Sequence, residues 1–186
     1  IRFRSSSVGN TMTYCDVHSG KYGVVCDSTS LETLQLSMEN SIVHNIAGDG
    51  LRLTGTSAVF ANTQVSNTLG TTVYIYGGAY QFVHCTIAQF YPFEAERGDA
   101  LFLSNHVDSV YNHLYMAHFI NSVITGYGDD VIMGSILEGQ DYRCDYLFDH
   151  CYLNTPAVED AEASIPVRLM SKEKSILLSP LLCEKK

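Results

Sequence analysis

The stretch Phe60-Ala61-Asn62-Thr63-Gln64-Val65 decides the fold, because the same pattern of residue types recurs along the chain. The pattern is an apolar residue, any residue, a polar ring or amide, a small residue, any residue and a second apolar residue. Its copies begin at Met12, Met38, Phe60, Phe82, Phe119 and Phe148. Self-similarity with a period of about 20 to 50 residues is typical of repeat architectures. We therefore expect one supersecondary unit to be built again and again.

A second pattern, a turn followed by apolar-any-apolar, lies after the first. Its clear copies are Gly48-Asp49-Gly50-Leu51-Arg52-Leu53, Gly70-Thr71-Thr72-Val73-Tyr74-Ile75, Gly98-Asp99-Ala100-Leu101-Phe102-Leu103 and Gly128-Asp129-Asp130-Val131-Ile132-Met133. Tyr22-Gly23-Val24-Val25-Cys26 is a degenerate early copy, and Pro166-Val167-Arg168-Leu169 is a late one. Gly and Asp favour tight turns. Alternation after the turn indicates a strand with one buried face.

Together the two patterns predict an all-β fold, a right-handed parallel β-helix (β-solenoid) of about six coils. Two longer loop insertions are expected, at 88–98 and 104–118, and a single β-helix domain spans 1–186. A leucine-rich repeat matches only Leu31-Glu32-Thr33-Leu34-Gln35-Leu36, and no helical pattern follows it. A β-sandwich would not explain why insertions of unequal size leave the first pattern intact.

Stacked coils place equivalent residues in vertical rows. The small residues of the first pattern form one such row: Cys15, Ser41, Thr63, Cys85, Ser122 and Cys151. The preceding Asn40, Asn62 and Asn121 are expected to form an amide ladder, with His84 and His150 in the same row. The six cysteines show no C-x-x-C spacing, which disfavours a zinc site, and we interpret them as core residues.

The F-x-N-[ST]-x-[VI] and G-D-x-L-x-L copies resemble right-handed parallel β-helix repeat proteins of the pectin-lyase-like superfamily. The resemblance is strongest to uncharacterised members that bacteria export or anchor as surface lipoproteins, and it covers Arg2 to about Ser171. It implies an extracytoplasmic location, with a signal or lipid anchor upstream of this piece of a longer chain. The superfamily includes lyases, hydrolases, epimerases and adhesins, so the resemblance implies no single activity.

Composition limits the partners. The formal net charge of −9 argues against nucleic acid, because phosphate binding needs clustered Lys and Arg. No apolar run is long enough for a transmembrane helix. A solenoid cut within its array also exposes strand edges, so capping by further segments or by a partner chain is expected.

The strands of the second pattern carry the most interesting outward residues. If Leu51, Val73, Leu101, Val131 and Val167 point inward, the outward stripe comprises Val25, Arg52, Tyr74, Phe102, Ile132 and Arg168, with Tyr76 beside it. Exposed aromatic and Arg side chains on a flat sheet suit a polysaccharide ligand. Alternatively, the loops at 88–98 and 104–118 fold over the stripe and bury it.

Catalytic and metal-binding candidates are fewer. Asp129 and Asp130 resemble the Asp-Asp element of polygalacturonases, although the other elements of that family do not appear in this chain. Asp129 takes the place of Asp49 and Asp99 in its copy, so a turn role already explains it. The same carboxylates are a candidate Ca²⁺ site. His106, Asp108, His113 and His118 could hold a metal, but a packed loop (Val107, Val110, Leu114 and Met116) is the simpler interpretation.

Three hypotheses follow from the sequence. The first is a non-catalytic, exported or surface protein that binds glycans through the stripe. The second is a carbohydrate-active enzyme, a polysaccharide lyase or glycoside hydrolase, with acidic residues near Asp129 and Asp130. The third is a structural spacer or adhesin stalk, in which loops cover the stripe.

Overall fold

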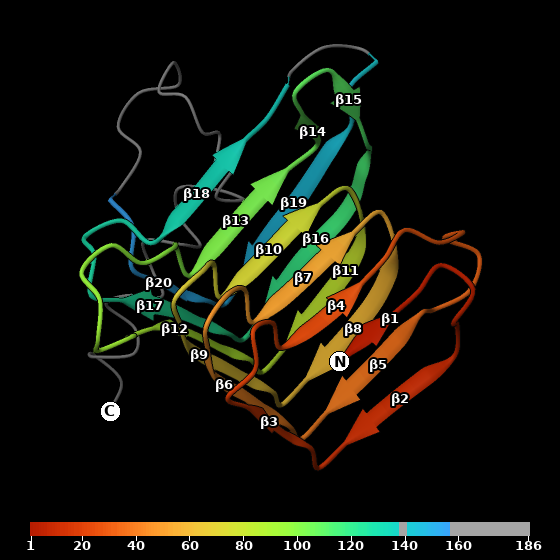
Figure 1. Ribbon diagram of the computed structural model, residues 1–186. Coiled ribbons are helices and arrows are strands. Elements are labelled where there is room, and N and C mark those ends of the chain that lie inside the picture. Colours follow the sequence, from red (N-terminus) through yellow and green to blue (C-terminus); the bar gives the residue numbers. More distant parts are fainter. Residues whose placement is uncertain (138–140, 157–186) are drawn as a thin grey trace.

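The computed structural model describes residues 1–137 and 141–156, and these form a parallel β-solenoid (Figure 1). Sheet A contains β1 (Arg2–Phe3), β4 (Val24–Cys26), β7 (Leu51–Thr54), β10 (Val73–Tyr76), β13 (Leu101–Ser104) and β18 (Ile132–Ser135). Sheet B contains β2 (Asn10–Thr13), β5 (Leu36–Glu39), β8 (Ser57–Ala61), β11 (Gly78–Val83), β16 (Leu114–Ile120) and β19 (Cys144–Asp149). Sheet C contains β3 (Asp16–His18), β6 (Ile42–Ile46), β9 (Gln64–Thr68), β12 (Thr86–Gln89), β17 (Val123–Gly126) and β20 (Tyr152–Leu153).

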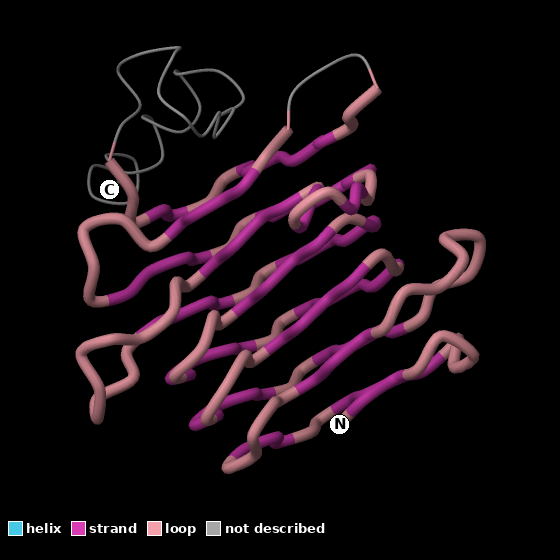
Figure 2. The backbone as a smooth tube through the Cα atoms, turned by 45° about the horizontal axis from the view of Figure 1, so that its top comes forward, coloured by secondary structure: helices cyan, strands magenta, loops and turns pink. Residues whose placement is uncertain are grey.

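Each coil passes through the three sheets in turn, and each strand pairs in parallel with its equivalent in the next coil. Figure 2 shows the coils stacked one above another, with loops of unequal length at the corners. The one antiparallel pair in the described part joins β14 (His106–Val107) to β15 (Val110–Tyr111). This architecture confirms the predicted all-β solenoid of six coils, while its handedness stays a prediction.

The core is a vertical stack of large apolar side chains from sheet B. In the middle coils the rings of Phe60, Phe82 and Phe119 lie face to face, with centroids 4.6 and 4.7 Å apart. Phe148 extends the stack, and Met12 and Met38 continue it at the other end. Burial of such side chains is the main stabilising contribution to the fold. We call this row the inner ladder.

The turn from sheet B to sheet C takes two residues in every coil. The first has a left-handed backbone, with φ between 47° and 56°, at Tyr14, Asn40, Asn62, His84, Asn121 and His150. Asn and His are enriched in this conformation, which explains the polar position of the sequence pattern. Of the predicted amide ladder, the structure contains one bond, from Asn62 Nδ2 to Asn40 Oδ1 (2.7 Å). His84 separates Asn62 from Asn121 and interrupts the ladder.

The second turn residue is the small one, and the predicted row is confirmed. Ser122 Oγ donates to the carbonyl of Ile120 and accepts from the backbone N–H of Cys85 (3.0 Å). The Cys85 and Cys151 thiols contact carbonyl oxygens at the equivalent place. Burial raises the pKa of both thiols to about 11, so they are unreactive core groups. Cys183 lies outside the described residues.

The long insertions are only partly as expected. The segment after β13 forms the β14–β15 hairpin and then enters sheet B at Leu114, which is fully buried. Val107 and Val110 were expected to pack on the solenoid, but they are 42% and 66% exposed. They occupy a hairpin that extends from the coil, as Figure 1 shows for β14 and β15.

Candidate functional site

The outward face of sheet A carries a continuous row of side chains in register. Arg52 pairs with Tyr74, Tyr74 with Phe102 and Phe102 with Met133, while Val25 precedes Arg52. Arg52, Tyr74 and Phe102 are each half-buried, so the loops leave them accessible in part. We call Arg52, Tyr74 and Phe102 the outer ladder.

The members of the outer ladder contact one another closely. The rings of Tyr74 and Phe102 are parallel within 2°, with centroids 5.3 Å apart. The Arg52 guanidinium lies 4.5 Å from the centroid of the Tyr74 ring, a cation–π contact. Each face of the Tyr74 ring is therefore partly covered, one by Arg52 and the other by Phe102. A ligand would meet the ring edges, the Tyr74 hydroxyl and the Phe102 surface toward Met133.

A row of equivalent turn residues, three of the four acidic, runs beside the outer ladder, and we call it the acidic row. The register places Asp49, Thr71, Asp99 and Asp130 at equivalent positions, each two residues before a paired residue of sheet A. Asp49 is engaged: its Oδ2 accepts from Arg52 Nη1 (2.7 Å) and its Oδ1 from the N–H of Thr71. Arg52 is thus neutralised within the site.

Asp130, and not Asp129 as the sequence suggested, is the repeat equivalent of Asp49 and Asp99. Its Oδ1 accepts hydrogen bonds from the N–H of Ile132 and the hydroxyl of Thr155. This is the turn role expected for the position. Asp129, the preceding residue of the same turn, is exposed.

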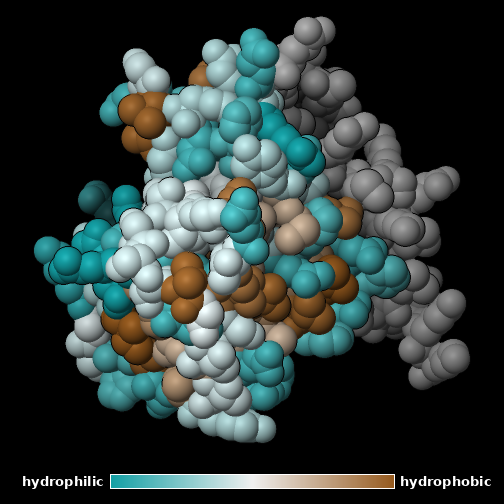
Figure 3. Space-filling view, turned by 90° about the vertical axis from the view of Figure 1, so that its right-hand side faces the viewer, coloured by the Kyte–Doolittle hydropathy of each residue, from teal (hydrophilic) through white to brown (hydrophobic). Residues whose placement is uncertain are grey.

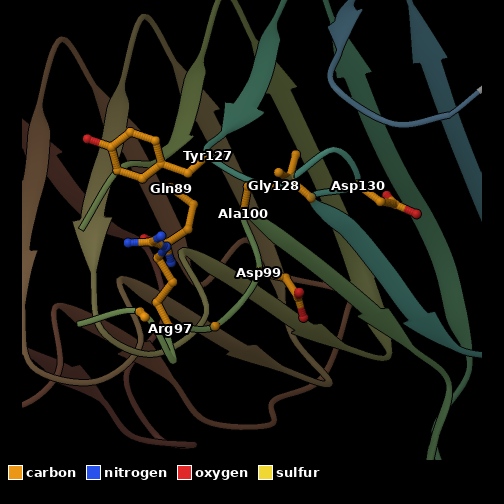
Figure 4. A pocket seen from close by; sticks show the side chains of 10 residues that line it. Gln89, Arg97, Asp99, Ala100, Tyr127, Gly128 and Asp130 are labelled. Carbon is orange, nitrogen blue, oxygen red and sulfur yellow. The ribbon is translucent and has the colours of Figure 1, made fainter. Parts of the chain in front are cut away.

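A cleft of about 260 Å³ opens at the end of the acidic row, between the 90–98 loop and the 127–130 turn. Figure 4 shows Arg97 and Tyr127 on one side of it and Asp99 and Asp130 on the other. Partial burial, and next the nearby charge of Asp130, raise the pKa of Asp99. Catalytic acids are commonly carboxyl groups that lie in a cleft and have a raised pKa.

The cationic side of the cleft is held by the loop itself. Arg97 Nη1 donates to the carbonyl oxygens of Tyr91 and Glu94, and its guanidinium lies 4.7 Å from the Tyr127 ring centroid. Beneath it, buried Gln89 donates to the carbonyl of Gly70 and accepts from the N–H of Tyr91. The cleft is therefore a shaped, polar site with charges of both signs.

Tyr76 lies beside the outer ladder and is engaged by the hairpin. Its hydroxyl donates to the carbonyl of Val110 (3.0 Å), and Asn112 Nδ2 donates to the carbonyl of Tyr76. Burial, and next the neighbouring Tyr74, raise the pKa of the Tyr76 hydroxyl. Tyr76 thus fixes the hairpin along one side of the face and offers little to a ligand.

The stripe inferred from the sequence needs one correction. Ile132 was expected to point outward, but it is buried at 1% exposure and its neighbour Met133 is 41% exposed. Val131 and Ile132 are both buried, and it is Ile132, not Val131, that pairs with Leu101 at the first inward position of the strand. Arg168 and Val167 lie outside the described residues.

Arg97 and Tyr127 were missed by sequence reasoning. Neither belongs to a repeat, and only folding brings their loop and turn together. Asp99 was visible as a turn residue of the second pattern, but its proximity to Asp130 depends on stacking of the coils. The signal that could have found it is the vertical equivalence of the acidic turn positions.

The other candidate residues form no metal site. Within the described ranges, no group of three or more His, Cys, Asp or Glu is arranged to hold a metal ion. His106 instead contacts Ser135, and His113 contacts Tyr111. The described residues also contain no helix that could cross a membrane.

Comparisons with protein-family models, with curated proteins and with solved structures found no match to this chain.

Proposed function

We propose that this chain is a non-catalytic, extracytoplasmic β-solenoid protein that binds glycans on the outward face of sheet A. The observation that carries the proposal is the partly exposed outer ladder on a flat parallel sheet, flanked by the acidic row. Aromatic surface with adjacent hydrogen-bonding groups suits sugars, which present apolar faces and hydroxyl groups together. The resemblance of the coils to surface-exposed members of the pectin-lyase-like superfamily supports the location.

Arg52 taken alone would suggest an acidic sugar as the ligand, but its ion pair with Asp49 changes this expectation. Because Asp49 neutralises Arg52, the centre of the face offers no free cation to an acidic sugar. Neutral hydroxyl-rich sugars suit it better, with Tyr74 and Phe102 as apolar surface and Asp49 as an acceptor.

The test is a screen of glycans and polysaccharides with the protein and its Tyr74→Ala/Phe102→Ala variant, with product analysis of every binder. The matched control is Tyr115→Ala/Tyr152→Ala, which removes two exposed aromatic rings from sheets B and C. We expect binding that the first variant loses and the control keeps, with no sugars released. Equal binding by all three proteins, or no binding by any, would overturn the proposal and favour a structural spacer or adhesin stalk.

One observation favours a second function, a carbohydrate-active enzyme. Asp99 has a raised pKa and faces the same cleft as Asp130, which is the arrangement of an acid and a second carboxylate in glycoside hydrolysis. In this alternative Asp99 protonates the leaving oxygen, and Asp130 acts as base or nucleophile. Sugar release that disappears in both Asp99→Asn and Asp130→Asn, but not in Asp129→Asn, would establish it.

A further inference from the structure

The corner between sheets B and C carries a second surface, independent of the sheet A face. In each coil the left-handed turn residue points outward, the small residue points inward, and the next residue points outward from sheet C. Two rows of outward side chains therefore flank a shallow groove of about 420 Å³, which we call the corner groove. One row contains Tyr14, Asn40, Asn62 and His84, and the other contains Ile42, Gln64 and Thr86.

The corner groove contains polar groups that the protein itself leaves unpaired. Asn62 Nδ2 is used by Asn40 Oδ1, and Gln64 Nε2 donates to Ser66 Oγ (3.0 Å). Within the described part of the chain, Asn40 Nδ2, Asn62 Oδ1, Gln64 Oε1 and the Thr86 hydroxyl make no side-chain hydrogen bond. The groove therefore offers a donor at Asn40, acceptors at Asn62 and Gln64, and a hydroxyl at Thr86. The Tyr14 side chain, 81% exposed, lies at one end.

The lining is made of polar and aliphatic side chains with one histidine, His84. No Lys, Arg, Asp or Glu contributes to the corner groove, although the chain carries a net charge of −9. A polyanion such as nucleic acid would find no cation there. Ile42 is the one large aliphatic side chain of the lining, so the groove does not suit a lipid or an apolar helix either. The chemistry that remains is a neutral, hydroxyl-rich chain.

The spacing separates a polysaccharide from a peptide. Equivalent side chains of successive coils recur at the separation of paired strands, about 4.8 Å. A peptide strand presents side chains on one side every ~6.6 Å, twice its rise per residue, and would fall out of register within two coils. A linear sugar chain advances per unit by a distance close to that of the coils. We propose that the corner groove binds a linear neutral polysaccharide along the solenoid axis, one sugar per coil.

The experiment is a titration of the isotope-labelled protein with neutral linear tetrasaccharides (cellotetraose, xylotetraose and mannotetraose), which match the four coils of the groove, read by NMR on the Asn and Gln side-chain amides. We expect at least one of them to shift the Asn40, Asn62 and Gln64 signals. Asn62→Gly/Gln64→Ala should weaken its Kd at least tenfold, because two hydrogen-bonding groups are lost. Glycine tolerates the left-handed backbone at residue 62 (φ 47°), so the fold is kept.

The matched control is Asn121→Gly, which removes the same side chain from the same row in a coil beyond the corner groove. It should bind as the parent does. The side-chain amides of Asn40, Asn62 and Gln64 lie in the corner groove, so their shifts separate this binding from any binding at the sheet A face. Three results overturn the inference: none of the three sugars shifts these amides at millimolar concentration, Asn121→Gly weakens binding equally, or tetragalacturonate binds as well as the neutral sugars.

Discussion

The inner and outer ladders arise from the same repetition but differ in what surrounds them. Phe82 stacks on Phe60 and Phe119 with both faces and every edge buried, at 1% exposure. Tyr74 stacks between Arg52 and Phe102 at the surface, with a wider spacing of 5.3 Å. Register alone therefore stacks like residues on either side of a sheet. Burial decides whether the stack stabilises the fold or remains available to a ligand.

The largest expected effect comes from breaking the inner ladder. Phe82→Ala should lower the free energy of unfolding by about 3–5 kcal/mol, because it opens a cavity between two stacked rings. Urea denaturation measures the loss, and Phe82→Leu should lose clearly less. A loss of unfolding free energy no larger than that of a typical surface substitution would show that the core closes around the cavity. The ring stack would then add little to stability.

Next comes the row of small residues that flanks the inner ladder. Ser122→Ala should cost about 1–3 kcal/mol, because the buried N–H of Cys85 loses its acceptor. Ser122→Cys is the control, since Cys occupies the equivalent position in three other coils, and it should retain most of the stability. If the alanine and cysteine variants unfold alike, the side chain at this position is only filling space.

A smaller effect is expected from the outer ladder. Tyr74→Ala should cost about 1–2.5 kcal/mol, the sum typical of one aromatic pair and one exposed cation–π contact. Tyr74→Phe keeps the ring and should be nearly neutral. A loss as large as that of Phe82→Ala would mean that the outer ladder is a structural element, and would count against its role in binding.

The smallest effect concerns pH and the acidic row. Because the folded pKa of Asp99 is raised, the folded protein binds this proton more tightly than the unfolded chain does. Its stabilising contribution is present below the unfolded pKa of about 3.9 and is lost as pH rises through the folded pKa.

Urea denaturation across the acidic pH range checks this dependence. Asp99→Asn should remove the fall in stability with rising pH. Asp130→Asn should reduce it only in part, because burial of Asp99 remains the larger cause. Identical pH profiles for the protein and Asp99→Asn would contradict the assignment.

The sequence predicted what repeats and failed where the repeat is broken. Residues such as Leu51, Val73 and Leu101 alternate cleanly, so their inward direction was correct. At Val131-Ile132-Met133 three apolar residues follow one another, and alternation could not fix the register. Because Ile132 pairs with Leu101, Asp130 and not Asp129 lies two residues before the first paired residue of the strand.

The candidate site was predictable to the same extent. Arg52, Tyr74 and Phe102 form one row because each follows an inward residue of the second pattern, and the structure brings them together as expected. The ion pair of Arg52 with Asp49 and the cleft with Arg97 were not predictable. They depend on side-chain direction and on a loop whose path no repeat dictates.

The two-residue turn between sheets B and C has a consequence for how such a chain changes during evolution. All six coils keep this turn at one length, whereas the corners on either side of sheet A accept loops of very different size. Whatever is recognised at the constant corner is offered again by each added coil, so affinity there grows with the number of coils. Insertions at the variable corners each create a single, unique pocket. Lengthening the array would thus tune avidity, and grafting loops would diversify specificity, without either change disturbing the other.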